Sequence, residues 1–227
     1  MALLSEQDRQ TVRAHLADVK DPVRLLFFTQ TIAGPETALM AKQILGEIAA
    51  LSDRVSVEEV NFILEKDRAA AYGITHVPGI AVLKGDADTR IRFLGAPAGY
   101  EFMSLIDAII LAGGSDSGLS DTSKTLIAAH VTEPLDIQVF VTPTCPHCPR
   151  AVTLAHRMAF EHPLIRGTCV EAAEFMDLSR QYKVTGVPKT VVNGTIEILG
   201  AVPEDTFVRT VLQQPEHPND DRVPAEP

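Results

Sequence analysis

The sequence has no excess of positive charge, no long apolar run and few cysteines. Its 20 lysines and arginines face 30 aspartates and glutamates, so the net charge is -10 and the pI is near 5.1. This balance argues against nucleic acids and anionic membranes as partners. No apolar run approaches the ~20 residues of a membrane-spanning helix, and the N-terminus lacks the basic region and apolar core of a signal peptide.

The three cysteines are Cys145, Cys148 and Cys169. A secreted disulfide scaffold would carry more cysteines, in even number. We therefore expect a protein of the cytoplasm, a reducing compartment, whose cysteines serve chemistry rather than structure. With 227 residues, of which 45% are hydrophobic, the chain is long enough for two small domains or one large one.

The most informative motif is Cys145-Pro146-His147-Cys148, which lies between an apolar run, residues 135–141, and a helix-like stretch, residues 150–160. A strand that feeds a helix through Cys-x-x-Cys places two thiols at a helix N-terminus, where the helix dipole favours a thiolate. Such a pair can form a disulfide and pass it to another protein. A passive, buried cysteine pair is the alternative.

Further ligands for a metal are missing. The sequence has no second Cys-x-x-Cys, and His156 and His162 have no partners at ligand spacing for zinc or an iron–sulfur cluster. It also lacks the Gly-x-Gly-x-x-Gly fingerprint of a dinucleotide-binding domain. We therefore expect neither a metal nor a bound cofactor.

The chain repeats itself in three matches that occur in the same order, which predicts a tandem duplication. Residues 25–35 align with 138–148, residues 72–78 with 182–188, and residues 94–96 with 199–201. Only the second copy has the cysteines, because Ile32 and Pro35 stand at the corresponding positions of the first. The first copy is then either a scaffold for the second or part of a surface for substrates or partners.

Each copy is expected to contain a strand, a helix, a strand, a helix, two strands and a closing helix. In the second copy we predict strands at 135–141, 164–170, 189–192 and 196–199, and helices at 146–161, 173–182 and 204–212. A strand pair joined through a helix is parallel, whereas Asn193-Gly194 indicates an antiparallel hairpin, so each four-stranded sheet is mixed. A further helix precedes each copy, at 6–19 and 122–131.

The expected domains are residues 1–114, without a dithiol, and residues 121–213, which carry it. A Gly- and Ser-rich linker at 113–121 joins the two domains. Residues 214–227, rich in Pro, Asp and Glu, are expected to form a disordered tail.

Residues 142–149, together with Val187-Pro188-Lys189, resemble the tandem thioredoxin-fold protein disulfide oxidoreductases, a glutaredoxin-like family of archaea and bacteria. The resemblance covers nearly the whole chain except the tail and implies two thioredoxin folds. Members of this family carry Cys-x-x-Cys in both halves. In having lost the first pair, the chain is similar to the N-terminal module of the flavoprotein component of alkyl hydroperoxide reductase.

The resemblance implies an enzyme that exchanges disulfides with other proteins. Cys145 would attack the substrate disulfide, and Cys148 would resolve the mixed disulfide. By the same resemblance, the partners would be disulfide-containing proteins, among them a flavoprotein similar to thioredoxin reductase and a peroxiredoxin. A protein disulfide oxidase or isomerase, and a redox-inert binding module, are the other interpretations.

Pro146 and His147 are expected to tune the thiols. Pro146 restricts the loop, and His147, when protonated, adds positive charge near Cys145. Strongly oxidising DsbA-type enzymes share this tetrad, so we expect a Cys145 pKa well below the ~8.5 of a free cysteine. The alternative is that His147 is a solvated loop residue.

Val187-Pro188 is interpreted as the cis-proline loop of a thioredoxin-like fold, which would expose the Val187 backbone to pair with a substrate peptide. The alternative is an ordinary trans proline at a strand start. Val77-Pro78 is expected to have the same geometry without the chemistry.

Four residues near the motif have open roles. Cys169, in an apolar strand, is either an inert core residue or a third redox thiol. Glu171, at the end of that strand, is either a proton acceptor for the resolving cysteine or a solvated carboxylate. Arg150 and Lys189 flank the site and either favour the thiolate or are ordinary surface charges.

Overall fold

The computed structural model describes residues 3–30 and 34–214. Ile32 and the predicted tail, apart from Gln214, lie outside the described residues. Within the described ranges, no helix combines the length and the apolar character needed to cross a membrane.

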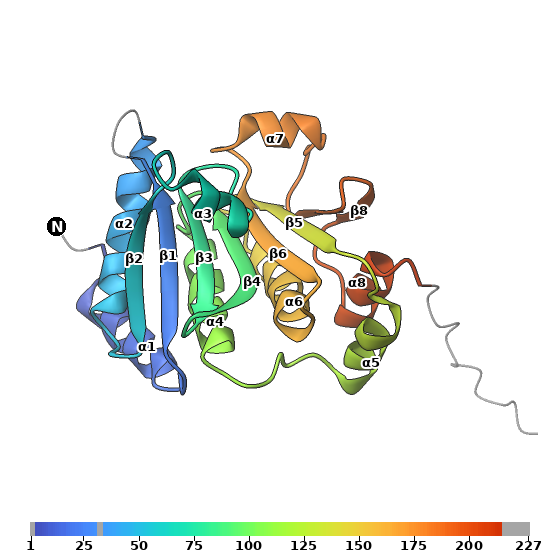
Figure 1. The fold of residues 1–227 in the computed structure, drawn as a ribbon, viewed down its shortest axis with the longest axis horizontal. Coiled ribbons are helices and arrows are strands. Elements are labelled where there is room, and N and C mark those ends of the chain that lie inside the picture. The colour runs from blue at the N-terminus through green and yellow to red at the C-terminus, as the bar shows by residue number, and fades with distance from the viewer. Residues whose placement is uncertain (1–2, 31–33, 215–227) are drawn as a thin grey trace, which may run out of the picture.

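Eight strands form one sheet in the order β2-β1-β3-β4-β6-β5-β7-β8 (Figure 1). The strands are β1 (Val23–Thr29), β2 (Val55–Asn61), β3 (Gly79–Lys84), β4 (Ala87–Leu94), β5 (Leu135–Val141), β6 (Ile165–Glu171), β7 (Lys189–Val192) and β8 (Ile196–Leu199). Each half contributes four strands with one parallel pair, β1–β2 or β5–β6, and one antiparallel hairpin, β3–β4 or β7–β8. The expected α/β class with a mixed four-stranded sheet in each copy is confirmed.

The helices are α1 (Glu6–Leu16), α2 (Glu36–Ala49), α3 (Lys66–Ala71), α4 (Glu101–Ala112), α5 (Asp121–His130), α6 (Cys148–Glu161), α7 (Met176–Gln181) and α8 (Glu204–Val211). The expected helix at 173–182 begins only at Met176. The reason is the buried Glu171 carboxylate, which accepts hydrogen bonds from the backbone N–H groups of Ala173 and Glu174 and holds these residues in a turn.

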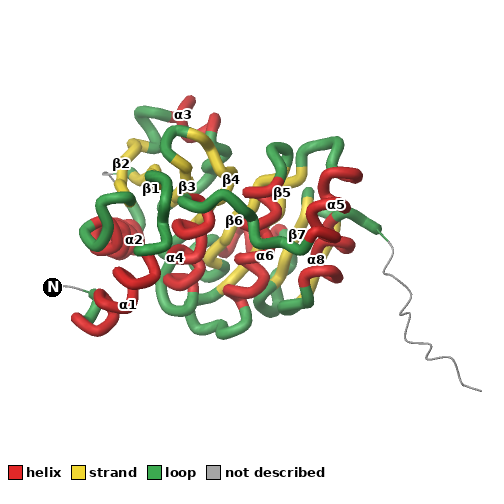
Figure 2. Tube along the Cα trace, turned by 90° about the horizontal axis from the view of Figure 1, so that it is seen from below, coloured by secondary structure: helices red, strands yellow, loops and turns green. Residues whose placement is uncertain are grey.

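The two halves join through β4 and β6, which pair in parallel and make the sheet continuous across the repeat boundary. In this pairing Phe93 lies opposite Cys169, and Leu94 lies opposite Val170. Helices α4 and α6 pack beside each other on one face of the sheet, as Figure 2 shows. The main hydrophobic core contains buried residues of both halves, so the copies do not have separate interiors.

Gly167 on β6 permits this close packing of helix on sheet. A Cβ at this position would lie 2.5 Å from the Ala155 carbonyl oxygen of α6. Only glycine lets β6 approach α6 so closely without a shift of the helix that carries the cysteine motif.

Candidate redox site

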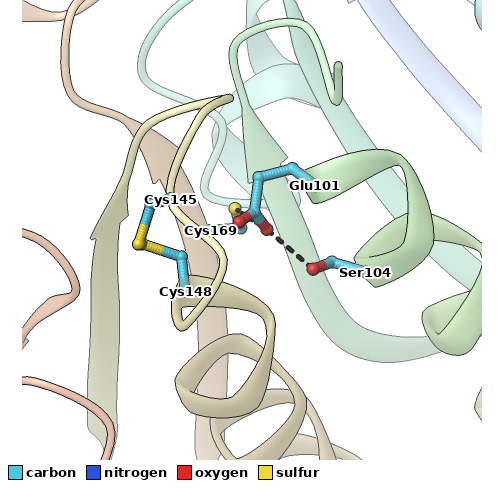
Figure 3. Close-up of a disulfide and its surroundings, with 5 residues drawn as sticks. All are labelled: Glu101, Ser104, Cys145, Cys148 and Cys169. Atoms are coloured by element: carbon cyan, nitrogen blue, oxygen red, sulfur yellow. Dashed lines mark hydrogen bonds between the residues drawn. A yellow bond between two sulfur atoms is a disulfide. The ribbon is translucent and has the colours of Figure 1, made fainter. Parts of the chain in front are cut away.

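Cys145 and Cys148 form a disulfide with a Cα–Cα distance of 5.5 Å, within the usual range (Figure 3). Cys145 follows the carboxyl end of β5 in a turn in which its N–H donates to the Thr142 carbonyl at 3.1 Å. Cys148 is the first residue of α6, whereas the sequence predicted a helix start near Pro146. His147 is the N-cap, and Pro149 lies in the first turn, where a missing N–H costs little.

The two sulfur-bearing residues differ in exposure. Cys145 is 8% exposed and Cys148 is 0% exposed, while Pro146 and His147 between them are exposed. The first turn of α6 contains no acidic residue, and its N-cap side chain makes no hydrogen bond to the backbone. The free N–H groups at this helix end therefore favour negative charge on the cysteines without competition from an acidic cap.

Both Val77–Pro78 and Val187–Pro188 are cis, as the resemblance to thioredoxin-like folds implied, so the trans alternative is wrong. In each copy the proline carbonyl accepts a hydrogen bond at 2.8 Å from the glycine that follows the last strand, Gly95 or Gly200. The sequence relationship between the copies thus extends to this local backbone geometry. In the second copy the loop leaves Val187 half-buried.

The cis-proline loop of the first copy is covered by α7 of the second. The His76 ring packs edge-on against Phe175 with a centroid distance of 5.1 Å, and its Nε2 lies 3.4 Å from the Asp177 carboxylate. Val77 packs into the smaller hydrophobic core together with Phe175. This loop therefore contributes to the junction between the halves.

The N-terminal half also supports the loop that carries the cysteines. The Tyr100 N–H donates to the Pro143 carbonyl at 3.0 Å. Gly99 has a φ of +60°, and a Cβ at this position would collide with the same carbonyl oxygen. Glycine at 99 thus lets the start of α4 lie directly against the turn between β5 and Cys145.

Glu101, the first residue of α4, brings a buried carboxyl to the surroundings of the disulfide (Figure 3). Its Oε2 accepts hydrogen bonds from Ser104 Oγ at 2.7 Å and from Cys169 Sγ at 3.6 Å. Its Oε1 is buried and has no hydrogen-bond partner among the described residues. Burial raises the pKa of this carboxyl, and the bonds from Ser104 and Cys169 offset part of the rise.

Sequence reasoning missed Glu101 because it lies in the copy without cysteines. A glutamate in the first turn of a helix is ordinary in sequence terms, since it complements the helix dipole. Only the β4–β6 pairing and the packing of α4 on α6 bring it to the second copy. A glutamate at the start of an apolar helix, shortly after the Leu-Gly-Ala match of the repeat, was the available signal.

Cys169 is a buried free thiol in β6. Burial, together with the nearby Glu101 carboxylate, raises the pKa of this thiol well above its ordinary value. It therefore stays protonated at neutral pH, and a protonated thiol is a poor nucleophile. This environment favours the inert interpretation of Cys169 over that of a third redox thiol.

For two flanking residues, the structure excludes one of the two interpretations that the sequence left open. Glu171 is not a solvated carboxylate: it is 5% exposed, burial raises its pKa, and its oxygens bind the backbone of the next turn. Lys189 is not a surface charge: it is buried, donates to the Tyr182 carbonyl at 2.7 Å and pairs with Glu197 at 2.9 Å. Arg150 is exposed.

In the part of the chain that the structure describes, no group of three or more His, Cys, Asp or Glu side chains could hold a metal ion.

Residues 135–213, which include the disulfide and the cis-proline loop, match the family model of the thioredoxin domain. With the same architecture present twice, the chain is a tandem thioredoxin-fold protein.

Sequence comparison relates this tandem thioredoxin-fold chain to a more specific group of proteins. The chain is 28% identical over 192 residues to the alkyl hydroperoxide reductase AhpF of Escherichia coli, and 24% identical over 197 residues to that of Pseudomonas aeruginosa. These matches cover 85% and 86% of this chain, but it spans only 34% of the length of either relative.

Two solved structures share the arrangement of both halves. The N-terminal domain of the alkyl hydroperoxide reductase AhpF from Enterococcus faecalis superposes with a TM-score of 0.85 at 26% identity, covering 92% of this chain and 99% of that one. A protein disulfide oxidoreductase from Aeropyrum pernix superposes with a TM-score of 0.83 at 28% identity, covering 92% of each chain. The chain is therefore a thioredoxin-like redox module related to these proteins.

Proposed function

We propose that this protein exchanges its Cys145–Cys148 dithiol or disulfide with the disulfides or dithiols of other proteins. The observation that carries the proposal is the pair of cysteines at the uncapped N-terminus of α6, in a fold with a cis-proline loop. Cys145 is slightly exposed, at 8%, and lies next to the exposed Pro146 and His147, whereas Cys148 is fully buried, so an incoming substrate would meet Cys145 first.

The exchange proceeds in two displacements. The Cys145 thiolate attacks one sulfur of a substrate disulfide, and the other substrate sulfur leaves as a thiolate. The Cys148 sulfur then attacks Cys145, releases the substrate as a dithiol and leaves the Cys145–Cys148 disulfide. Two electrons pass to the substrate, and the same steps run backwards oxidise a dithiol.

The second displacement requires that the buried Cys148 thiol lose its proton. We propose that Glu101 accepts it, because this carboxyl is buried in the surroundings of the disulfide and its Oε1 has no hydrogen-bond partner among the described residues. Its raised pKa brings it closer to the range in which a carboxyl can both take and return a proton near neutral pH. Ser104 and Cys169 hold Oε2 and so fix the orientation of the group.

We propose that electrons flow through this protein as through a carrier, from a reductase to an acceptor protein. Similarity to the alkyl hydroperoxide reductase AhpF supports a module that accepts electrons from a flavoprotein reductase similar to thioredoxin reductase and passes them to a peroxiredoxin. Both partners are inferred from the resemblance, and binding and turnover measurements with each of them test the inference.

A second candidate is a protein disulfide oxidase or isomerase, favoured by the Cys-Pro-His-Cys tetrad and by the structural similarity to a protein disulfide oxidoreductase. The reduction potential separates the two functions. A potential near the ~-270 mV of thioredoxin supports the electron carrier, whereas one near the ~-120 mV of DsbA supports the oxidase.

Insulin reduction in the presence of dithiothreitol tests the exchange itself. We expect activity in the wild type and none in Cys145→Ser. Cys148→Ala should also lack turnover; when it is reduced, freed of dithiothreitol and mixed with the substrate, it should hold the substrate as a covalent adduct that added reductant releases. Failure of the wild type to reduce insulin or any small disulfide would support a redox-inert binding module. Capture of substrate by Cys148 in Cys145→Ser would reverse the two roles.

A further inference from the structure

A groove of about 570 Å³ adjoins the redox site on the side of α7. It extends from Thr142, whose carbonyl binds the Cys145 N–H, to Val187, which precedes the cis proline. A substrate chain that lies along the cis-proline loop with its sulfur at Cys145 would therefore continue into this groove. Because an extended chain advances ~3.3 Å per residue, the residues next to the reacting cysteine would occupy it.

The lining is apolar where the groove meets the sheet. Ala172, Val184 and Val187 are half-buried there, and the Met176 side chain on α7 is 55% exposed. Met176 and Arg180, which line the groove from α7, are both exposed, so this face of the short helix is open to a ligand. An aliphatic side chain of a partner would remove these groups from water.

Two cations, Arg180 and Lys183, also line the groove, and both are exposed. Over residues 3–30 and 34–214, neither side chain has an ion pair or a hydrogen bond. Among the described residues, Arg180 and Lys183 are the only charged residues that line the groove, so its charge complements an acidic segment.

The N-terminal half holds this groove in shape. Helix α7 is held to the smaller hydrophobic core by its half-buried Leu178, and Phe175 and Asp177 add contacts to the His76 ring and its Nε2. The cis-proline loop of the first copy thus braces the helix that forms one wall of the groove. This brace gives the copy without cysteines a part in substrate recognition.

We propose that the groove binds an extended, acidic segment of the protein substrate that directly flanks its reactive cysteine. An aliphatic side chain of the segment lies over Ala172, Val184 and Val187, and its carboxylates meet Arg180 and Lys183. The inference rests on the proposed exchange function and names the chemistry of the partner that this site selects.

The test uses peptides that carry one cysteine as a mixed disulfide with 2-thiopyridine. Reduced Cys145 attacks the peptide sulfur, thiopyridone leaves and is read by absorbance, and Cys148 then displaces the peptide thiol as the protein disulfide forms. Two peptides share a leucine next to the cysteine; one adds two aspartates and the other two lysines. Uncharged dithiodipyridine reports the intrinsic reactivity of Cys145.

In the wild type at low salt, we expect the acidic peptide to react roughly tenfold or more faster than the basic one, with a ratio that shrinks as salt rises. Arg180→Gln/Lys183→Gln should remove this preference and leave the rate with dithiodipyridine unchanged. A matched control is Lys20→Gln/Arg54→Gln. These exposed cations precede the N-terminal ends of β1 and β2, which run parallel to β5. Because Cys145 follows the carboxyl end of β5, the two control residues lie at the other end of the strands from the redox site.

Equal rates for the two peptides in the wild type would overturn the proposal, as would an equal loss of preference in the control variant. A wild type that fails to react with dithiodipyridine would instead refute the exchange function. Replacing the peptide leucine by serine should slow both peptides, and an unchanged rate would remove the apolar contact from the proposal.

Discussion

Glu101 of the N-terminal half accepts a hydrogen bond from the Cys169 thiol of the C-terminal half at 3.6 Å, and both residues are buried near the Cys145–Cys148 disulfide. One thioredoxin fold thereby supplies a buried acid to the surroundings of the other's disulfide. Residues of both copies thus surround the disulfide, so a copy without a dithiol can contribute to the exchange proposed above.

Replacing Glu101 by Gln tests this participation. The amide preserves the shape and can still accept from Ser104, but it cannot take a proton from Cys148, so we expect insulin reduction at neutral pH to fall at least about tenfold. The first step should be spared, so single-turnover attack by Cys145 on dithiodipyridine should keep its rate.

Glu171→Gln is the matched control for this variant, because Glu171 is also a buried carboxyl with a raised pKa, but its oxygens bind the neighbouring backbone. Its exchange rate should stay close to that of the wild type. Equal losses in the two variants would contradict a specific role of Glu101, and urea unfolding of both variants would separate damage to the junction from a proton-accepting role of Glu171.

His156 predicts how stability depends on pH. The residue is 2% exposed, packs against Phe93 at a centroid distance of 5.0 Å, and burial lowers its pKa to about 3. Between pH 6.5 and about 3, this histidine is protonated in the unfolded chain but neutral in the folded protein. The free energy of unfolding therefore decreases as the pH falls, by up to about 1.4 kcal/mol per pH unit.

In His156→Gln this share of the acid sensitivity should disappear. Urea unfolding at pH 7 and at pH 5 should give a smaller difference in the free energy of unfolding for the variant than for the wild type. Identical differences in the two proteins would mean that His156 does not titrate in this window.

Cys169→Ala tests the inert interpretation of the third cysteine. The substitution removes a buried sulfur and one weak donor to Glu101, so we expect a loss of roughly 1 kcal/mol in the free energy of unfolding. Exchange activity should remain within a few-fold of the wild type, because Ser104 still holds Oε2. Loss of most activity with an intact fold would show that Cys169 takes part in the chemistry.

Sequence reasoning predicted best the elements whose bounds are set by neighbouring residues in the sequence. Strand β7 ends at Val192 as expected because Asn193 and Gly194 both adopt positive φ, +49° and +73°, which is the turn their sequence favours. The cis geometry of Pro188 followed from the family resemblance and not from a local signal, because most X-Pro bonds are trans. The start of α7 was placed too early because the Glu171 carboxylate overrides the intrinsic preference of Ala173 and Glu174 for a helix.

Contacts between the halves carried no comparable signal. The pairing of Phe93 with Cys169 joins two strands of different copies, and nothing in either strand specifies the partner. The contact of Glu101 with Cys169, the contact of His76 with Phe175 and the burial of Lys189 all depend on three-dimensional neighbours of this kind. The dithiol was therefore predictable and its surroundings were not.

His147 gives the last prediction. It is the exposed N-cap of α6 and lies between the two cysteines, and its imidazolium would stabilise the Cys145 thiolate and with it the reduced form. His147→Gly should therefore raise the Cys145 pKa and make the reduction potential more negative. A single exposed charge near a helix end is worth roughly 1 kcal/mol, and ~30 mV corresponds to about 1.4 kcal/mol for this couple, so the shift should be some tens of millivolts. Equilibration with glutathione gives the potential, and thiolate absorbance against pH gives the titration. If both match the parent protein, the free N–H groups of α6 alone activate the cysteine.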